Sequence, residues 1–410
     1  MKLLIPRILQ LRFFLTIFLL GFAFGASPDE AAAQKAYDPG VTDIEIKIGN
    51  IAPYTGWGSE YASSTRAEAA YFQMINDRGG VNGRKISFVS LDGASEPANT
   101  LPLTRKLVEE EKVLLLFSTV GTESNLAIRD YLNRVKVPQL FVQSSSAVFN
   151  DPAHFPWTMG FFATYRDEGV AYARYVLAHK PAGKIAVLYA NDDAGKEYLA
   201  GVRAGLGDQA AAMIVKEVSY QVSDASLDAQ IATLKDSGAD VFFNFAIGPF
   251  ATKSIRAAYD LGWRPLQFIP NASLSIAAFL EPAGLEKSAR VICNARSKGW
   301  WSPRSHDDPA VREFLEWMSK YNPKANLRDQ DNVAGYERAQ TLVAVLQKCG
   351  DNLTRANVMK QAANLDLELG MLRPGIKITT TPTDYQPVHQ LFLIRFDGQQ
   401  WQGFGGLIGF

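Results

Sequence analysis

The chain has 410 residues, 47% of them hydrophobic, and its 42 Lys and Arg residues balance its 42 Asp and Glu residues at a formal net charge of +0. This length is more than one compact core usually takes, so it predicts two domains. The neutral charge, without any basic run, argues against nucleic acid as a partner.

The first 33 residues are predicted to be an export signal. Basic residues precede an apolar run at 13–24, which is shorter than the ~18 residues that a bilayer span needs. Small residues follow, so cleavage is expected between residues 25 and 34. The alternative is a membrane anchor that is never removed. No later run is long and apolar enough to span a bilayer, so a soluble periplasmic protein is expected.

From residue 44 onwards, the sequence predicts strands that alternate with helices. Gly79-Gly80 ends the first helix and Asn82-Gly83 turns the chain into a strand, because Gly adopts positive φ without a Cβ penalty. Alternating strands and helices imply a parallel sheet that is covered on both faces. The strands expected in this first half are 44–48, 85–91, 113–118 and 138–143.

The same order of elements starts again after residue 160, which predicts a second lobe of like architecture. A helix with an apolar stripe from Tyr336 to Leu346 follows and ends at Gly350. The last segment predicts antiparallel strands joined at Asp397-Gly398, and these need a sheet to join. The strands expected in the second lobe are 184–191, 213–220, 240–246 and 267–272, and residues 289–297 read as one more strand.

The sequence nominates no catalytic group and no cofactor. It lacks a phosphate-binding P-loop, a G-x-S-x-G nucleophile elbow, an H-E-x-x-H pair and a G-x-G-x-x-G turn. Its four histidines are scattered, with no carboxylate or cysteine at metal-ligand spacing. Cys293 and Cys349 could pair in an oxidising compartment, but there is no disulfide framework, and the sequence leaves their state open.

Loops at the carboxyl ends of the predicted strands are the expected ligand site, because open α/β sheets bind ligands there. Gly121 and Thr122 lead into a helix whose free N–H groups suit a small carboxylate, although Thr122 could simply cap that helix. Ser144 and Ser145 form a second polar loop. Trp57 offers an aromatic wall, unless it plugs a core edge. Together these residues favour a ligand with a charged head and a hydrophobic body.

Three segments carry a family resemblance. IKIGNIAPYTGWGSEYASS (46–64) contains a P-x-T-G opening, INDRGGVNGRKI (75–86) is close to N-x-x-G-G-(I/V)-N-G-(R/K), and NVAGYERAQTLV (332–343) lies in the second half. From about residue 42 to the final strands, the chain resembles the type I periplasmic solute-binding proteins of the branched-chain amino acid (leucine/isoleucine/valine-binding) family of ABC importers.

The resemblance implies an α/β fold of two doubly wound parallel-sheet lobes joined by a three-crossing hinge, the type I periplasmic binding protein fold. Lobe one would take residues 42–160 and 293–368. Lobe two would take residues 161–292 and 369–410.

The resemblance also implies a set of ligand-binding residues. The ligand carboxylate would meet the backbone of Gly121 and the hydroxyls of Thr122, Ser144 and Ser145, and Trp57 would cover the rest of the ligand. Lobe two would contribute Tyr165, Ala194, Phe245 and Asn271.

The sequence departs from the amino-acid binders of this family at two positions. Ala194 stands where they commonly place an aromatic residue, and Asn271 stands where they place an acid for the α-ammonium group. A buried ammonium without a carboxylate partner is costly. An aromatic or other hydrophobic carboxylate without an amine is therefore a candidate ligand, beside branched-chain and other hydrophobic amino acids.

The function that the resemblance implies is transport. The chain would be the periplasmic substrate-binding component of an ABC importer, a monomer that captures its ligand by lobe closure and delivers it to an ABC permease in the inner membrane. A ligand-sensing protein that presents a small molecule to a membrane receptor is the alternative. A secreted α/β enzyme is a third possibility, for which no residue is placed to perform turnover.

Overall fold

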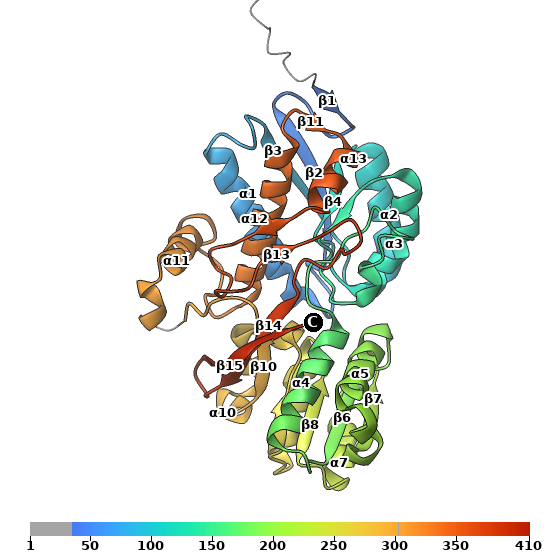
Figure 1. Cartoon of the computed structure of the whole chain (residues 1–410), viewed down its shortest axis with the longest axis vertical. Helices are drawn as coiled ribbons and strands as arrows, with labels where there is room; N and C mark the ends of the chain where they lie inside the picture. Colours follow the sequence, from blue (N-terminus) through green and yellow to red (C-terminus); the bar gives the residue numbers. More distant parts are fainter. Residues whose placement is uncertain (1–34, 302) are drawn as a thin grey trace, which may run out of the picture. The chain divides into compact units, whose positions relative to one another are not determined.

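The computed structural model describes residues 35–301 and 303–410, so the predicted export signal lies outside the described residues. Strands and helices alternate through most of this part of the chain (Figure 1). In it, no helix is both long and apolar enough to cross a membrane.

The first sheet has four parallel strands in the order β3-β2-β4-β5. Helix α1 packs against α12 on one side of it and α2 packs against α3 on the other, so helices cover both faces (Figure 1). The strands are β2 (Glu45–Ala52), β3 (Lys85–Asp92), β4 (Leu115–Phe117) and β5 (Gln139–Leu140). The helices are α1 (Ala62–Asp77), α2 (Pro97–Arg105), α3 (Thr122–Val135), α12 (Asp331–Cys349) and α13 (Arg355–Ala362).

The predicted corner between α1 and β3 is confirmed. Helix α1 ends at Asp77 and β3 begins at Lys85, and both Gly80 and Gly83 adopt positive φ between them. A Cβ at Gly80 would collide with the backbone of Arg84, so this turn requires glycine for both conformation and space.

The second sheet has seven strands in the order β15-β14-β10-β9-β8-β6-β7. Strands β6 to β10 are parallel, whereas β14 and β15 are antiparallel. The strands are β6 (Ile185–Ala190), β7 (Ile214–Tyr220), β8 (Val241–Phe245), β9 (Leu266–Phe268), β10 (Ile292–Ala295), β14 (Gln390–Phe396) and β15 (Trp401–Gly409). The main helices around it are α4 (Tyr165–His179), α5 (Asp193–Leu206), α7 (Asp228–Asp236) and α8 (Pro249–Asp260).

The chain leaves the second sheet for the first at a later residue than the sequence predicts. Residues 293–295 were expected with the first sheet, but β10 pairs with both β9 and β14 of the second. Ile292 and Cys293 are fully buried there, and the apolar strand fills the place between the parallel strands and the antiparallel tail. The tail itself turns at Asp397-Gly398, where Phe396 pairs with Trp401.

Smaller elements complete the described chain. Strand β1 pairs with β11 in parallel, and β12 pairs with β13 in an antiparallel ribbon. The remaining strands are β1 (Ala36–Tyr37), β11 (Asn352–Leu353), β12 (Asp366–Leu367) and β13 (Ile378–Thr379). The remaining helical segments are η1 (Ser59–Tyr61), η2 (Lys106–Glu110), η3 (Ala147–Phe149), η4 (Gly207–Gln209), η5 (Asn271–Ser273), η6 (Ile276–Leu280), η7 (Pro303–Asp307), α6 (Ala210–Met213), α9 (Glu281–Ala283), α10 (Leu285–Ser288) and α11 (Pro309–Tyr321).

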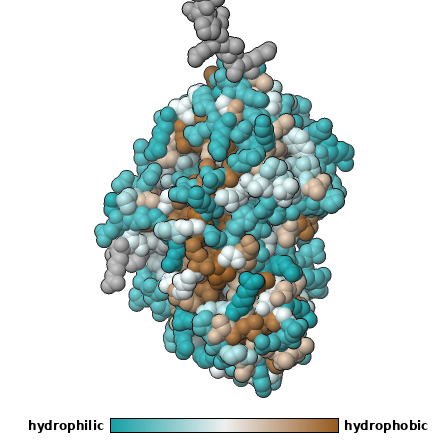
Figure 2. Space-filling model, viewed as in Figure 1, coloured by the Kyte–Doolittle hydropathy of each residue, from teal (hydrophilic) through white to brown (hydrophobic). Residues whose placement is uncertain are grey.

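The two cysteines are buried and free, so the bridge that the sequence left open is absent. Cys293 lies in β10 of the second sheet, and Cys349 is the last residue of α12 beside the first. Outside the core, the face drawn in Figure 2 is largely hydrophilic, with hydrophobic residues gathered in its middle near β14.

Candidate ligand-binding site

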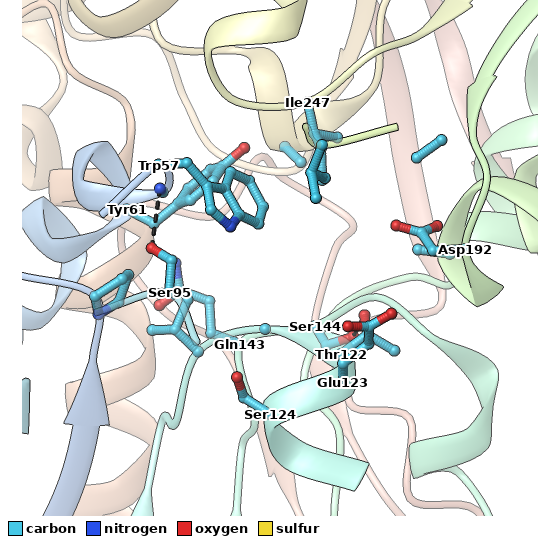
Figure 3. A pocket seen from close by; sticks show the side chains of 18 of the residues that line it. Trp57, Tyr61, Ser95, Thr122, Glu123, Ser124, Gln143, Ser144, Asp192 and Ile247 are labelled. Atoms are coloured by element: carbon cyan, nitrogen blue, oxygen red, sulfur yellow. Dashed lines mark hydrogen bonds between the residues drawn. The ribbon is translucent and has the colours of Figure 1, made fainter. Parts of the chain in front are cut away.

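A cavity of about 560 Å³ lies between loops of the first and second sheets (Figure 3). This volume is in the range of about 300–1,000 Å³ that small-molecule sites occupy. Trp57 follows β2 of the first sheet. Ala190 is the last residue of β6 in the second sheet, and the lining residues 191–194 come directly after it. The cavity therefore lies at the carboxyl ends of the strands, where ligands of open α/β sheets bind.

Hydroxyl groups gather on the first-sheet side of the cavity. The hydroxyl oxygens of Thr122 and Ser144 are 2.8 Å apart in a hydrogen bond (labelled in Figure 3). Burial raises the pKa of the Tyr165 hydroxyl, and the nearby hydroxyls of Thr122 and Ser144 oppose that rise. Ser145 also lines the cavity, and its carbonyl accepts a bond from the N–H of Tyr165.

The N-terminus of α3 lies beside these hydroxyls, because Thr122 is the first residue of the helix. Gly121, with a φ of 96°, is the N-cap residue, and no side chain caps the helix, so Thr122 does not have the capping role considered from the sequence. The first bond back along this helix runs from the N–H of Asn125 to the carbonyl of Gly121. The preceding N–H groups are therefore available to an anion such as a carboxylate.

Trp57 is half-buried and faces the cavity rather than plugging a core edge. A Cβ built on Gly248 would lie 3.5 Å from its ring, so the indole packs over the loop that follows β8. Tyr61 reaches the same loop, where its hydroxyl accepts a hydrogen bond from the N–H of Gly248. These two aromatic residues thus bring the first-sheet loop against the second-sheet loop.

On the second-sheet side, Ala194 and Asn271 line the cavity. The side-chain nitrogen of Asn271 donates to the carbonyl of Asn294 at 2.9 Å, and its N–H donates to Glu168 at 2.9 Å. Glu168 is buried behind the cavity wall, and burial raises its pKa to about 7. A carboxylate is therefore present near Asn271, but it lies behind this residue and does not line the cavity.

Eight of the nine expected site residues line this cavity: Trp57, Gly121, Thr122, Ser144, Ser145, Tyr165, Ala194 and Asn271. Phe245 does not. It is 1% exposed and stacks on Tyr198, with ring centroids 4.4 Å apart. The reason is that β8 is a central strand covered on both faces. Phe245 is its last residue, and its side chain enters the core under α4 and α5.

Sequence reasoning missed the acidic character of the cavity. Two of the acids belong to the DDAG segment, but Asp331 begins α12, far away along the chain, where no local pattern indicates a site. No Lys, Arg or His is among the described residues that line the cavity. In the described part of the chain, no group of three His, Cys, Asp or Glu side chains could hold a metal ion. The acids are Glu96, Glu123, Asp192, Asp193 and Asp331.

Two arginines lie behind the cavity wall, and each has a carboxylate partner. Arg338 and Glu68, both fully buried, are 2.9 Å apart, and Arg338 also donates to the side-chain oxygen of Gln143. Arg296 is paired with Glu337 at 2.9 Å. Their positive charge is thus largely balanced before any ligand binds.

Comparison with known proteins agrees with this architecture. The profile of the family described as "Periplasmic binding protein" matches residues 45–400. The Leu/Ile/Val-binding protein homolog 1 of Brucella abortus is 24% identical over 349 residues, covering 80% of this chain and 85% of that protein. An amino acid binding protein of Pseudomonas aeruginosa is 24% identical over 225 residues, covering 53% of this chain and 58% of that protein.

Solved structures share the fold. A branched-chain amino acid ABC transporter structure from Thermus thermophilus with bound valine has a TM-score of 0.79 at 16% identity and covers 90% of this chain and 97% of its own. A solute-binding protein from R. palustris in complex with 4-hydroxybenzoate has a TM-score of 0.73 at 19% identity and covers 89% and 97%. The relatives are binding proteins and not enzymes. The chain belongs to the periplasmic binding protein family, as a type I member of the branched-chain amino acid group.

Proposed function

We propose that this protein is the substrate-binding component of an ABC importer. In the periplasm, it captures a small hydrophobic or aromatic carboxylate, or a branched-chain or other hydrophobic amino acid, and delivers it to a permease in the inner membrane. The observation that carries this proposal is the cavity between the two sheets, with a hydroxyl-lined helix N-terminus on one wall and an aromatic residue on another.

The chemistry of the walls supports a carboxylate headgroup. Hydroxyls of Thr122 and Ser144 and the free N–H groups of α3 can donate to an anion, and the helix dipole favours negative charge at that point. Trp57 covers the space beside them and suits an apolar body. Two of the solved structures are named with a bound ligand, valine in one and 4-hydroxybenzoate in the other, and both ligands carry this headgroup.

Capture would take place by closure of two lobes. We assign residues 42–160 and 296–368 to lobe one and residues 161–295 and 369–410 to lobe two, which moves the expected boundary by three residues, to the end of β10. A ligand that contacts both lobes binds the closed arrangement better, so it shifts the protein towards closure. The protein acts as a monomer in this scheme.

A thermal-shift screen tests the proposal. The protein without its predicted signal is heated with leucine, valine and phenylalanine, and in parallel with benzoate and 4-hydroxybenzoate. A ligand at 100 times its Kd adds about 2.7 kcal/mol to the stability of a protein that binds it only in the native state. A rise in Tm with at least one of these carboxylates is expected. A flat response to all of them, together with a rise for a sugar or a metal ion, would overturn the proposal.

A further inference from the structure

The charge of the cavity bears on which carboxylate it accepts. Five acidic side chains line it and no basic side chain does, among the residues that the structure describes. Glu96, Glu123 and Asp193 are exposed, so water screens them well. Asp192 caps α5, where its carboxylate accepts a bond from the N–H of Gly195 at 2.8 Å. These four acids therefore need no further partner.

Asp331 differs from the other four acids. It is mostly buried at the start of α12, and it lines both the main cavity and an adjoining cavity of about 30 Å³. Within the described chain, no donor binds its carboxylate, whereas the neighbouring Asp329 accepts bonds from Ser275 and from the N–H of Asp331 itself. A mostly buried carboxylate without a donor is costly unless a cation binds it.

The groups that surround Asp331 do not supply that cation. Burial and the Asp329 carboxylate raise the pKa of Asp331 well above its ordinary range, while the charges of Arg338 and Arg296 oppose the rise. Each arginine forms an ion pair, Arg338 with Glu68 and Arg296 with Glu337, which balances its charge. One guanidinium nitrogen of each still has no hydrogen-bond partner in the described chain, and Arg296 lines the adjoining cavity beside Asp331. Lys298 lines the adjoining cavity as well, and its ammonium group is paired with Asp308 at 2.7 Å. Tyr61 is another titratable neighbour, and its pKa is raised by burial and by Asp331.

Asn271 presents a second acceptor to the same space. It lines both cavities that Asp331 lines. Because its side-chain nitrogen donates to Asn294 and its N–H donates to Glu168, the Oδ1 atom is the part of its amide that no described donor uses. An ammonium group carries three donors and requires such acceptors.

We infer that the Asp331 carboxylate, together with Oδ1 of Asn271, binds the α-ammonium group of an amino acid ligand. The inference rests on the proposed function and narrows it, since the ligand carboxylate then binds at the N-terminus of α3. The protein discriminates against acids of the same shape that lack the amine, because these would leave Asp331 unpaired. Sequence comparison at Asn271 alone pointed to amine-free acids, and the position of Asp331 reverses that expectation.

Isothermal titration of matched ligand pairs tests the inference. Leucine is compared with 4-methylpentanoate, and phenylalanine with 3-phenylpropanoate, on the wild type and on the Asp331→Asn variant. The wild type is expected to prefer the amino acid of each pair. Removal of one partner of a buried charge pair is strongly unfavourable. Asp331→Asn should therefore lower the affinity for the amino acids by about 30-fold or more, and the affinity for the amine-free acids by much less.

Asp208→Asn is the matched control, because it removes an exposed acid of the second-sheet half that does not line the cavity. It should change amino acid affinity by less than about threefold, as surface charges contribute little. Thermal unfolding of both variants checks that each is folded. Asp331→Asn should be at least as stable as the wild type, because burial no longer opposes an ionised carboxyl at this position.

Proton exchange gives a second signature. Since Asp331 must be ionised to bind an ammonium group and its pKa in the free protein is raised, amino acid binding should release a proton and tighten as the pH rises above the ordinary range of an aspartate. Titrations in buffers of different ionisation enthalpy measure that release, which Asp331→Asn should abolish. Unchanged leucine affinity in Asp331→Asn would overturn the inference. Tight binding of the amine-free acids alone would also overturn the inference, but it would leave the proposed function intact. If no ligand of either series bound, both the inference and the proposed function would be overturned.

Discussion

The hydroxyl of Tyr61 accepts a hydrogen bond of 2.9 Å from the N–H of Gly248 and so joins a first-sheet loop to a second-sheet loop. Tyr220 accepts a similar bond of 3.2 Å from the adjacent N–H of Ile247, but it belongs to the second sheet itself. The two bonds form a matched pair in which only the first crosses between the sheets.

Tyr61→Phe is therefore expected to loosen the contact between the two halves. One hydrogen bond contributes about 1 kcal/mol, so ligand affinity should fall by about two- to tenfold. Small-angle X-ray scattering of the unliganded protein should show a larger radius of gyration for Tyr61→Phe. Tyr220→Phe, the control, should keep the wild-type radius. Equal radii for all three proteins would contradict the prediction.

Thr122→Val removes a hydroxyl from the proposed carboxylate site and keeps the shape of the side chain. It leaves Ser144 without its 2.8 Å partner, so ligand affinity measured by titration should drop at least about tenfold. Thr100→Val provides the comparison, because that hydroxyl is buried in α2 without a hydrogen-bond partner in the described chain. Its affinity should match the wild type. A similar loss in both variants would indicate a general disturbance.

Arg338→Met should destabilise the fold, because it leaves Glu68 buried without its 2.9 Å ion-pair partner. Loss of one member of such a pair costs about 3–5 kcal/mol. Replacement of both members, as in Glu68→Gln with Arg338→Met, should recover most of the loss. Urea unfolding of the three proteins measures this. A double variant as unstable as the single one would show that packing, and not charge, is responsible.

Glu168 predicts a pH dependence of stability. Burial raises its pKa from 4.5 to about 7, which the N–H of Asn271 and the amide of Asn294 only partly oppose. Because the folded state holds this proton more tightly than the unfolded chain, its contribution is full below pH about 4.5 and is lost as the pH rises to about 7.

Glu168→Gln should therefore be more stable than the wild type at neutral pH, by up to about 3 kcal/mol, and should resemble it near pH 5. The glutamine oxygen can still accept the bonds from Asn271 and Asn294. Urea unfolding at several pH values measures the difference. A variant that is less stable at every pH would show that the carboxylate is ionised and stabilising in the fold.

Cys293 and Cys349 should behave as two buried thiols. Burial raises the pKa of both, that of Cys349 to about 12, so neither forms a thiolate readily. A thiol reagent should react with neither cysteine in the native protein and with both in urea. Absence of reaction in urea without a reductant would reveal a disulfide instead.

Local patterns in the sequence were enough to predict most of the fold. Gly79-Gly80 and Asn82-Gly83 specify their turn through backbone conformation alone, and the alternation of strands with helices specifies a parallel sheet. Phe245 was wrongly placed in the site because a strand buried on both faces has no polar side to indicate which residue faces a ligand. Asp331 was missed because tertiary folding, and not sequence spacing, brings it to the cavity beside Asn271.

The order of the second sheet also sets the order in which it can be completed. Strand β14 lies between β10 and β15, so the edge of β10 has no neighbour until residues 390–396 have been synthesised. An unpaired strand edge in a growing chain can join the wrong partner. The chain must therefore leave the ribosome as far as residue 396 before β10 gains its second neighbour, and the sheet stays open at that edge until then.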